Sequence, residues 1–168
     1  MTLSHRPMEI RDADAICSFA RSAEELFLAF PEASYPLTPE ALWDVSRQRS
    51  CPTVALWDGE VAGYVNFLEV KERYFCAIGN LLVHPDHRRK GVATHLVKVM
   101  VRTAIEAHGV RFVRAASFSH NQKAYQLFHK LGFRPSDLEQ KLTSDGTPLL
   151  VVNLYLNRKN ACCETGQM

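Results

Sequence analysis

The segment from Leu81 to Thr94 has the composition of an anion-binding site. Three consecutive cations, Arg88, Arg89 and Lys90, come directly before Gly91 and can screen phosphates from the rim of such a site. The residues after Gly91 follow a helical pattern, and the first amides of a helix lack an intrahelical acceptor and attract negative charge. Gly91 has no Cβ, so the backbone can come close to a ligand there. The segment therefore predicts a phosphate cradle at the beginning of a helix.

A basic, solvated loop in front of an ordinary helix is the alternative interpretation, because clusters of Lys and Arg before helices are common. Two observations favour the cradle. Cations at a helix N-terminus are unfavourable unless an anion binds there. The segment also lies between a strand pattern and a helix pattern, which is the context that supports a phosphate-binding motif.

Four other polar residues stand out by position. Asn66 and Asn80 interrupt apolar strand patterns, and buried amides need hydrogen-bond partners, so each either orients a ligand or satisfies a neighbouring backbone group. Tyr125 follows Asn121 by one helical turn, so the two side chains share one face of the same helix. Asn121 also stands where a helix N-cap is expected.

Periodicity predicts the elements that position these residues. The helix over 91–108 has the clearest pattern, with apolar pairs every four residues and Gly109 after its end. We expect further helices over 12–28, 38–49 and 121–131, and strands over 8–11, 53–57, 61–69, 74–83, 111–117, 133–141 and 149–156. One strand–helix–strand unit among hairpins predicts a mixed sheet.

The composition is that of an ordinary folded domain. The chain has 168 residues, 46% of them hydrophobic and 23% charged, and a formal net charge of +2. So small a charge gives no reason to expect nucleic acid or an anionic membrane surface as a partner. No apolar run approaches the roughly 18–20 residues that span a bilayer, and no signal-peptide pattern is present, so we expect a cytoplasmic protein.

We expect one domain over residues 1–156 and a disordered tail over 157–168. The five cysteines contain no Cys-x-x-Cys pair, so neither a disulfide framework nor a metal site is expected. They are Cys17, Cys51, Cys76, Cys162 and Cys163. Buried or unreactive thiols are the simplest interpretation, and the role of the last two stays open.

Two motifs resemble those of the GNAT superfamily of acyl-CoA-dependent N-acetyltransferases. The first is Val83-x-Pro85-x-x-Arg88-x-x-Gly91-x-Ala93, similar to the acyl-CoA signature [RQ]-x-x-G-x-[GA]. The second is Asn121-x-x-Ala124-Tyr125-x-Leu127-Phe128-x-x-Leu131-Gly132-Phe133, similar to the family's N-x-x-A-x-x-[LF]-[YF]-x-x-x-G-F. Both occur in the family's order, and the resemblance covers about residues 8–156.

The resemblance implies an α+β fold with a mixed, mostly antiparallel sheet of six to seven strands, flanked by about four helices and with splayed central strands. It implies that acetyl-CoA is the cosubstrate. The backbone of Leu81, Leu82 and Val83 would pair with the pantetheine arm, and an amide there would stabilise the developing oxyanion. The pyrophosphate would lie on the amides of Arg89, Lys90, Gly91, Val92, Ala93 and Thr94, with Arg88 closing the loop and Asn121 a further contact.

The resemblance also suggests catalytic groups. A tyrosine near Tyr125 donates a proton to the departing thiolate in many relatives, although simple packing of the ring is the alternative here. Many relatives use a central-strand carboxylate as the base, but Asn80 stands at that position. Glu69 and His120 are the remaining candidates for the base, and relay through ordered water is the alternative.

The acceptor is implied to be a primary amine that attacks acetyl-CoA directly, and its identity stays open between proteins and small molecules. Phe30 and Tyr35, in the loop after the first helix, are candidate acceptor contacts together with Asn66 and Asn80. No acidic cluster favours a polycation. A homodimer is one expectation for the assembly. The alternative function is a CoA-binding sensor without turnover.

Overall fold

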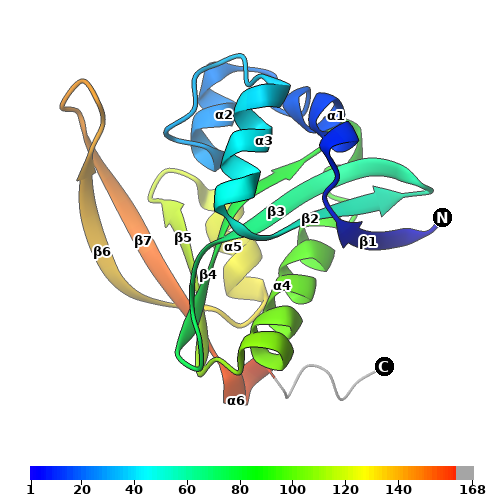
Figure 1. The fold of residues 1–168 in the computed structure, drawn as a ribbon. Coiled ribbons are helices and arrows are strands. Elements are labelled where there is room, and N and C mark those ends of the chain that lie inside the picture. The colour runs from blue at the N-terminus through cyan, green and yellow to red at the C-terminus, as the bar shows by residue number, and fades with distance from the viewer. Residues whose placement is uncertain (162–168) are drawn as a thin grey trace. The chain divides into compact units, whose positions relative to one another are not determined.

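The computed structural model describes residues 1–161. Seven strands are hydrogen-bonded in the order β1-β2-β3-β4-β5-β7-β6, which confirms the predicted α+β fold with a mixed sheet (Figure 1). The strands are β1 Leu3–Pro7, β2 Ser50–Trp57, β3 Glu60–Lys71, β4 Phe75–Val83, β5 Phe112–Phe118, β6 Arg134–Leu142 and β7 Pro148–Asn157. The helices are α1 Ala13–Cys17, α2 Ala23–Ala29, α3 Pro39–Gln48, α4 Val92–His108, α5 Gln122–Lys130 and α6 Arg158–Ala161, with 3-10 turns η1 Ile10–Asp12 and η2 Pro85–His87.

The chain divides into two compact units. Unit 1 contains Met1–Val70 and Ile78–Met100, so it holds β1, β2, all of β3 except Lys71, the later part of β4 and the first part of α4. Its strands β1, β2 and β3 pair antiparallel, with Trp57 opposite Glu60 at the predicted Asp58-Gly59 hairpin turn. The side chains of α1, α2 and α3 contribute to one core cluster that includes Ile16, Leu26 and Leu42.

Unit 2 contains Lys71–Ala77 and the chain from Val101 onward. Residues 75–77 of β4 pair parallel with residues 112–114 of β5, and β5, β7 and β6 follow in antiparallel register. The rings of Phe75 and Phe112 stack at 5.5 Å. Helix α5 ends at Gly132, whose φ of 89° and neighbouring bond from the Phe133 amide to the Phe128 carbonyl close its last turn.

The N-terminal region differs from the prediction. The strand lies at Leu3–Pro7 instead of 8–11, because Glu9 and Asp12 form a capping box that starts η1. The helix expected over 12–28 is two helices, since Ser22 accepts a hydrogen bond from the Glu25 amide at 3.1 Å and thereby caps a new one. The predicted cap of the next helix is confirmed: Thr38 Oγ1 accepts from the Ala41 amide at 3.2 Å.

The C-terminal end of the described chain differs from the prediction. Strand β7 continues to Asn157 and residues 158–161 form α6, so disorder from residue 157 is wrong for this part. The Asn157 side chain accepts a hydrogen bond from the Lys159 amide at 3.1 Å, which supports the first turn of α6. Cys162 and Cys163 lie outside the described residues.

Candidate functional site

The backbone after β4 turns sharply into α4. His84 caps η2, because its Nδ1 accepts a hydrogen bond from the Asp86 amide at 3.1 Å. Arg89 and Gly91 follow with φ angles of 61° and 88°. This left-handed region is strained for most residues and unstrained for glycine. The loop therefore depends on Gly91 at the point where the helix begins.

The amides at the beginning of α4 form a cluster of hydrogen-bond donors. The His95 amide donates to the Gly91 carbonyl at 2.9 Å, and this is the first bond of the helix. The amides of Val92, Ala93 and Thr94 come before it and have no acceptor within the helix. A Cβ placed on Gly91 would meet no atom within 4 Å, so the space beside it is open. This geometry suits a phosphate group.

Arg88 forms an ion pair with Glu25 of α2. Its Nη1 and Nη2 each lie 3.0 Å from a Glu25 carboxylate oxygen. Nη2 also donates to the Phe19 carbonyl at 3.1 Å, and Nε to the Val83 carbonyl at 3.4 Å. The Arg88 hydrogen bond and one from the Arg21 amide lower the pKa of Glu25 to about 2. Arg88 therefore fastens the loop to α2, and Arg89 and Lys90 are the other two cations that precede Gly91.

A row of aromatic rings supports the basic loop. Lys90 Nζ lies 5.6 Å from the centre of the Trp57 ring, and Trp57 lies 5.4 Å from His87. His87 contacts His84, which meets Phe19 edge to face at 5.2 Å. Burial, then Lys90 and His84, lower the pKa of His87. The neutral ring is therefore favoured, and the loop's positive charge is carried by its Lys and Arg residues.

The predicted pantetheine contacts lie at the end of β4. Leu82 is buried, whereas Leu81 and Val83 are partly exposed. The His84 amide donates to the Ala62 carbonyl at 2.8 Å and so ties the end of this strand to β3. Pairing of these residues with a ligand stays a prediction.

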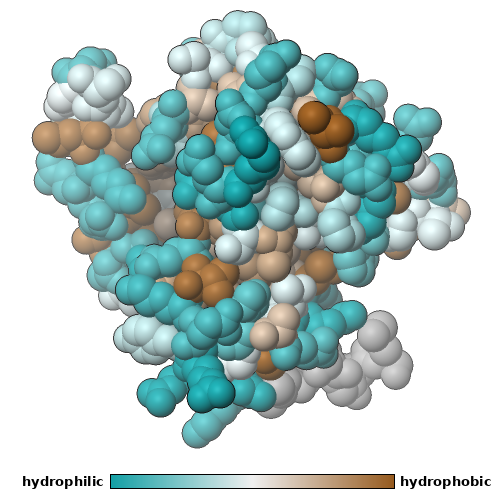
Figure 2. Space-filling model, in the orientation of Figure 1, coloured by the Kyte–Doolittle hydropathy of each residue, from teal (hydrophilic) through white to brown (hydrophobic). Residues whose placement is uncertain are grey.

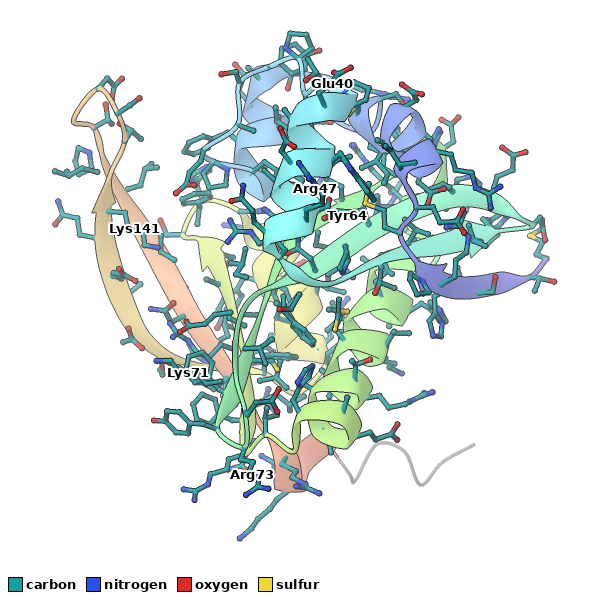
Figure 3. All side chains as sticks on the ribbon, in the orientation of Figure 1. Glu40, Arg47, Tyr64, Lys71, Arg73 and Lys141 are labelled. Carbon is teal, nitrogen blue, oxygen red and sulfur yellow. The ribbon has the colours of Figure 1, made fainter. Side chains whose placement is uncertain are left out.

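Asn66 and Asn80 belong to a buried chain of hydrogen bonds within unit 1. The Asn80 amide nitrogen donates to the Ala29 carbonyl at 2.8 Å, and the Asn66 amide nitrogen donates to Asn80 Oδ1 at 3.0 Å and to the Tyr64 hydroxyl at 2.9 Å. The hydroxyl of Tyr64, which Figure 3 labels, in turn lies 2.8 Å from Ser46 Oγ on α3. Asn80 has a φ of 53°, so a left-handed residue interrupts β4 at this point.

The Ala29 carbonyl fixes the orientation of both amides. A carbonyl only accepts, so Asn80 turns its NH₂ group toward it and its Oδ1 toward Asn66. Asn66 then gives its two donors to Asn80 and Tyr64. Its own Oδ1 is buried and has no hydrogen-bond partner among residues 1–161. An ordered water or a ligand N–H would satisfy this acceptor.

The remaining candidates in unit 1 are Phe30, Tyr35 and Glu69. Phe30 is 3% exposed and stacks on Tyr64 at 6.2 Å, so its ring packs in the core of unit 1. Tyr35 is 47% exposed, and its hydroxyl donates to the Arg21 carbonyl at 3.2 Å. Glu69 is exposed on β3.

The candidates in unit 2 lie on or just before α5. Asn121 Oδ1 accepts from the Ala124 amide at 3.2 Å, which makes Asn121 the N-cap. Tyr125 is half-buried and stacks on His129 at 5.8 Å. Within residues 1–161 its hydroxyl has no hydrogen bond. His120 is exposed and stacks on Phe118 at 5.7 Å.

Three of the cysteines, Cys17, Cys51 and Cys76, lie in the described chain. Burial raises the pKa of Cys17 to about 11 and also raises that of Cys51, while Cys76 is buried. Residues 1–161 contain no group of three or more His, Cys, Asp or Glu side chains arranged to hold a metal ion. None of the helices in this range has both the length and the hydrophobicity needed to cross a membrane.

Comparison with known proteins shows the family. Residues 16–133 match the model of the acetyltransferase (GNAT) family. The chain belongs to this family. The match includes both the loop with Gly91 and the α5 segment with Asn121 and Tyr125, so the resemblance inferred from the two motifs is confirmed.

Curated relatives of this GNAT protein are distant. Spore coat polysaccharide biosynthesis protein SpsD of Bacillus subtilis is 28% identical over 76% of the chain, and the chain spans only 45% of that protein. Spermidine N(1)-acetyltransferase of Escherichia coli K12 is 27% identical over 76% of the chain and 70% of its own length.

Solved structures share the GNAT fold with this chain. The spermidine N-acetyltransferase of Vibrio cholerae, solved with CoA and spermine, has a TM-score of 0.79 at 16% identity, covering 95% of this chain and 98% of that one. YncA of Salmonella typhimurium, solved with acetyl-CoA, has a TM-score of 0.71 at 22% identity, covering 94% of both chains.

Sequence reasoning missed two residues in this GNAT chain. Glu25 could have been found from the Ser-x-x-Glu pattern of Ser22 to Glu25, which is typical of a helix N-terminus. That pattern would have revealed the helix break but not the partner, Arg88, which is 63 residues away. Tyr64 gave no signal, because an aromatic residue in an apolar strand is ordinary and its hydrogen bonds depend on the tertiary fold.

Proposed function

We propose that this GNAT protein is an N-acetyltransferase that transfers the acetyl group of acetyl-CoA to a primary amine. The observation that supports it most is the amide cluster of Val92, Ala93 and Thr94 beside Gly91, in a chain of this family. The donors form a ready site for the pyrophosphate. Arg89 and Lys90 add positive charge at the rim of this site. This charge favours binding of the negatively charged 3′-phosphate or diphosphate of CoA.

The residues of the loop fit this cosubstrate. Gly91 has open space on the side where a Cβ would stand, so a phosphate oxygen can come within hydrogen-bond distance of the main chain. Arg88 is engaged by Glu25 and two carbonyls, so it shapes the loop and leaves phosphate binding to the amides and the neighbouring cations. Two proteins with the same fold were solved with CoA or acetyl-CoA.

In the proposed reaction the neutral amine nitrogen attacks the thioester carbonyl carbon. The carbon–sulfur bond then breaks, an amide forms, and the nitrogen loses one proton while the CoA thiolate gains one. We propose Tyr125 as the donor to the thiolate, because its motif matches the family and its hydroxyl has no other bond within residues 1–161. The proton from nitrogen passes to water in this scheme, since Asn80 cannot act as a base and its amide is fixed by Ala29.

The class of acceptor is proposed from the relatives of the chain. A relative and a neighbour of the same fold are spermidine acetyltransferases, so polyamines belong in the first set of amines to test. Amino acids, peptide N-termini and aminoglycosides complete the set. We propose a primary amine as the class and leave the choice among these to turnover.

The test is release of CoA thiol from acetyl-CoA in the presence of each amine, with a thermal shift by acetyl-CoA measured on the same protein. We expect acetyl-CoA to raise the melting temperature by mass action and at least one amine to accelerate thiol release. Binding without turnover by any amine would replace the enzyme with the CoA-binding sensor. No thermal shift with saturating acetyl-CoA would contradict both functions.

A further inference from the structure

Strand β6 is an open edge of the sheet in unit 2. It is the last strand in the hydrogen-bonding order, and all nine of its residues are exposed. The hairpin that it forms with β7 extends beyond β5, because the last residue of β5, Phe118, pairs with Val151 and β7 begins three residues earlier at Pro148. Such an edge presents unpaired backbone donors and acceptors that another strand can use.

One face of this hairpin carries exposed leucines. The register pairs Leu138 with Val152, Gln140 with Leu150 and Leu142 with Pro148, so these side chains share one face. Leu138, Leu142 and Leu150 are 66%, 69% and 49% exposed. Figure 2 shows hydrophobic side chains on this hairpin, at the left of the view. Leucines grouped on an open edge indicate a contact surface.

The opposite face of β6 carries two charges without partners. The Asp137 side chain is bonded to Asn153 and Ser136, but the side chains of Glu139 and Lys141 have no ion pair or hydrogen bond within residues 1–161. Figure 3 labels Lys141 on this strand. A strand that ends a sheet thus offers one free anion and one free cation, two residues apart and on the same face.

We propose that β6 pairs antiparallel with β6 of a second copy of this chain, about a twofold axis through Gln140. The run from Leu138 to Leu142 reads Leu-Glu-Gln-Lys-Leu. In this register Leu138 faces Leu142 of the other copy, Glu139 faces Lys141, and Gln140 faces itself. Every charge meets its opposite and every leucine meets a leucine, and such directly opposed pairs stabilise antiparallel strands. A twofold axis makes the same contacts twice.

The neighbouring registers lack this match. An axis through Glu139 would oppose two glutamates, and one through Lys141 would oppose two lysines. An axis between Gln140 and Lys141 would set Glu139 against Leu142. Only the axis through Gln140 satisfies both the charges and the leucines, so the side chains themselves select one register.

The register makes a charge-reversal test specific. Glu139→Lys would place two lysines opposite two lysines across the axis, and Lys141→Glu would place glutamates opposite glutamates. We expect sedimentation equilibrium over protein concentrations up to about 1 mM to show a dimer for the natural chain. Each single variant should raise its dissociation constant at least about tenfold, because two attractive pairs become repulsive. The double variant should restore the dimer.

Mixing the two single variants tests the pairing between copies directly. In the mixed dimer each lysine of Glu139→Lys faces a glutamate of Lys141→Glu, so the mixture should dimerise although each variant alone does so poorly. Lys98→Glu and Glu106→Lys, at exposed positions of α4, are matched controls for net charge and should leave the dissociation constant unchanged. A natural chain that stays monomeric, single variants that dimerise like it, or a mixture that does not associate would each overturn the proposal.

Discussion

Tyr64 and Tyr125 carry hydroxyl groups in opposite situations. Tyr64 is fully buried, and its hydroxyl joins Ser46 to Asn66, while burial raises its pKa. Tyr125 is half-buried, and its hydroxyl makes no hydrogen bond within residues 1–161. The same substitution, Tyr to Phe, therefore removes a structural bond at one position and a free hydroxyl at the other.

Tyr64→Phe should destabilise the protein by about 1–3 kcal/mol, because a buried Asn66 N–H and the Ser46 hydroxyl both lose a partner. Urea unfolding at neutral pH measures the change, with Tyr125→Phe as the matched control. An equally small loss in both variants would mean that the hydroxyl of Tyr64 contributes little to stability.

Tyr125→Phe should leave stability unchanged, since no hydrogen bond is lost. If Tyr125 protonates the thiolate, acetyl transfer should fall by roughly ten- to a thousandfold while acetyl-CoA affinity stays the same. Single-turnover kinetics and a binding titration on the same variant measure the two quantities. Full activity in this variant would assign the ring to packing alone.

The Glu25–Arg88 ion pair predicts a pH dependence. Arg88 lowers the pKa of Glu25 from 4.5 to about 2, so the charged form is favoured in the folded state. Its stabilising contribution is then complete above about pH 4.5 and lost as the pH falls toward 2. The difference in unfolding free energy between the natural chain and Glu25→Gln should shrink over this range and stay constant near neutrality.

The magnitude of this contribution is limited by solvent. The side chains of Arg88 and Glu25 are 39% and 35% exposed. We therefore expect a coupling of about 1 kcal/mol or less in a double-mutant cycle with Arg88→Gln. A difference that persists unchanged down to about pH 2 would contradict the pair as its source.

At the scale of elements, the beginning of α4 predicts a specific effect of Gly91→Ala. The new Cβ would stand in the space where a phosphate comes close to the amides, so acetyl-CoA affinity should fall at least about tenfold. Gly59→Ala is the matched control, because Gly59 has a φ of 89° against 88° for Gly91 and also has nothing within 4 Å. Both variants carry the same backbone strain, and calorimetric titration should show weaker binding for Gly91→Ala alone.

The elements with strong local patterns could be predicted from the sequence. The helix after Gly91, the Asp58-Gly59 hairpin and the Thr38 cap all depend on neighbouring residues, and each was found. The region before Ser22 was predicted less well, because its apolar residues keep helical spacing across the break. The side chain of Ser22 caps a new helix at this point, and hydrophobic periodicity alone does not reveal such a break.

The parts of the site that could be predicted from the sequence are those formed by local backbone structure. The loop with Gly91 and the cap at Asn121 follow from local sequence. The contacts of Arg88 with Glu25 and of Asn66 with Asn80 join segments that are distant along the chain. Such pairs are set by the tertiary fold, so no spacing rule could identify them.

At the scale of the whole molecule, unit 1 and unit 2 share three elements. The division falls between Val70 and Lys71 at the end of β3, between Ala77 and Ile78 within β4, and between Met100 and Val101 within α4. A helix cut to about half its 17 residues is marginal by itself, so α4 needs both units to be folded. We therefore expect one cooperative unfolding transition.

Tryptophan fluorescence tests this expectation, because the only two tryptophans, Trp43 and Trp57, lie in unit 1. Far-UV circular dichroism reports both units. The two signals should give the same midpoint in urea. Separate midpoints would mean that unit 2 unfolds independently.

The donors at the beginning of α4 are main-chain amides, while the side chain of Arg88 in the same loop is engaged by Glu25. Every residue except proline supplies the same amide. Mutation can therefore replace much of such a loop over evolutionary time without erasing its ability to bind an anion, provided that the backbone keeps its course at Gly91. Proteins of this fold can therefore share the backbone conformation while their sequences differ. This agrees with a TM-score of 0.79 to the Vibrio cholerae protein at only 16% identity.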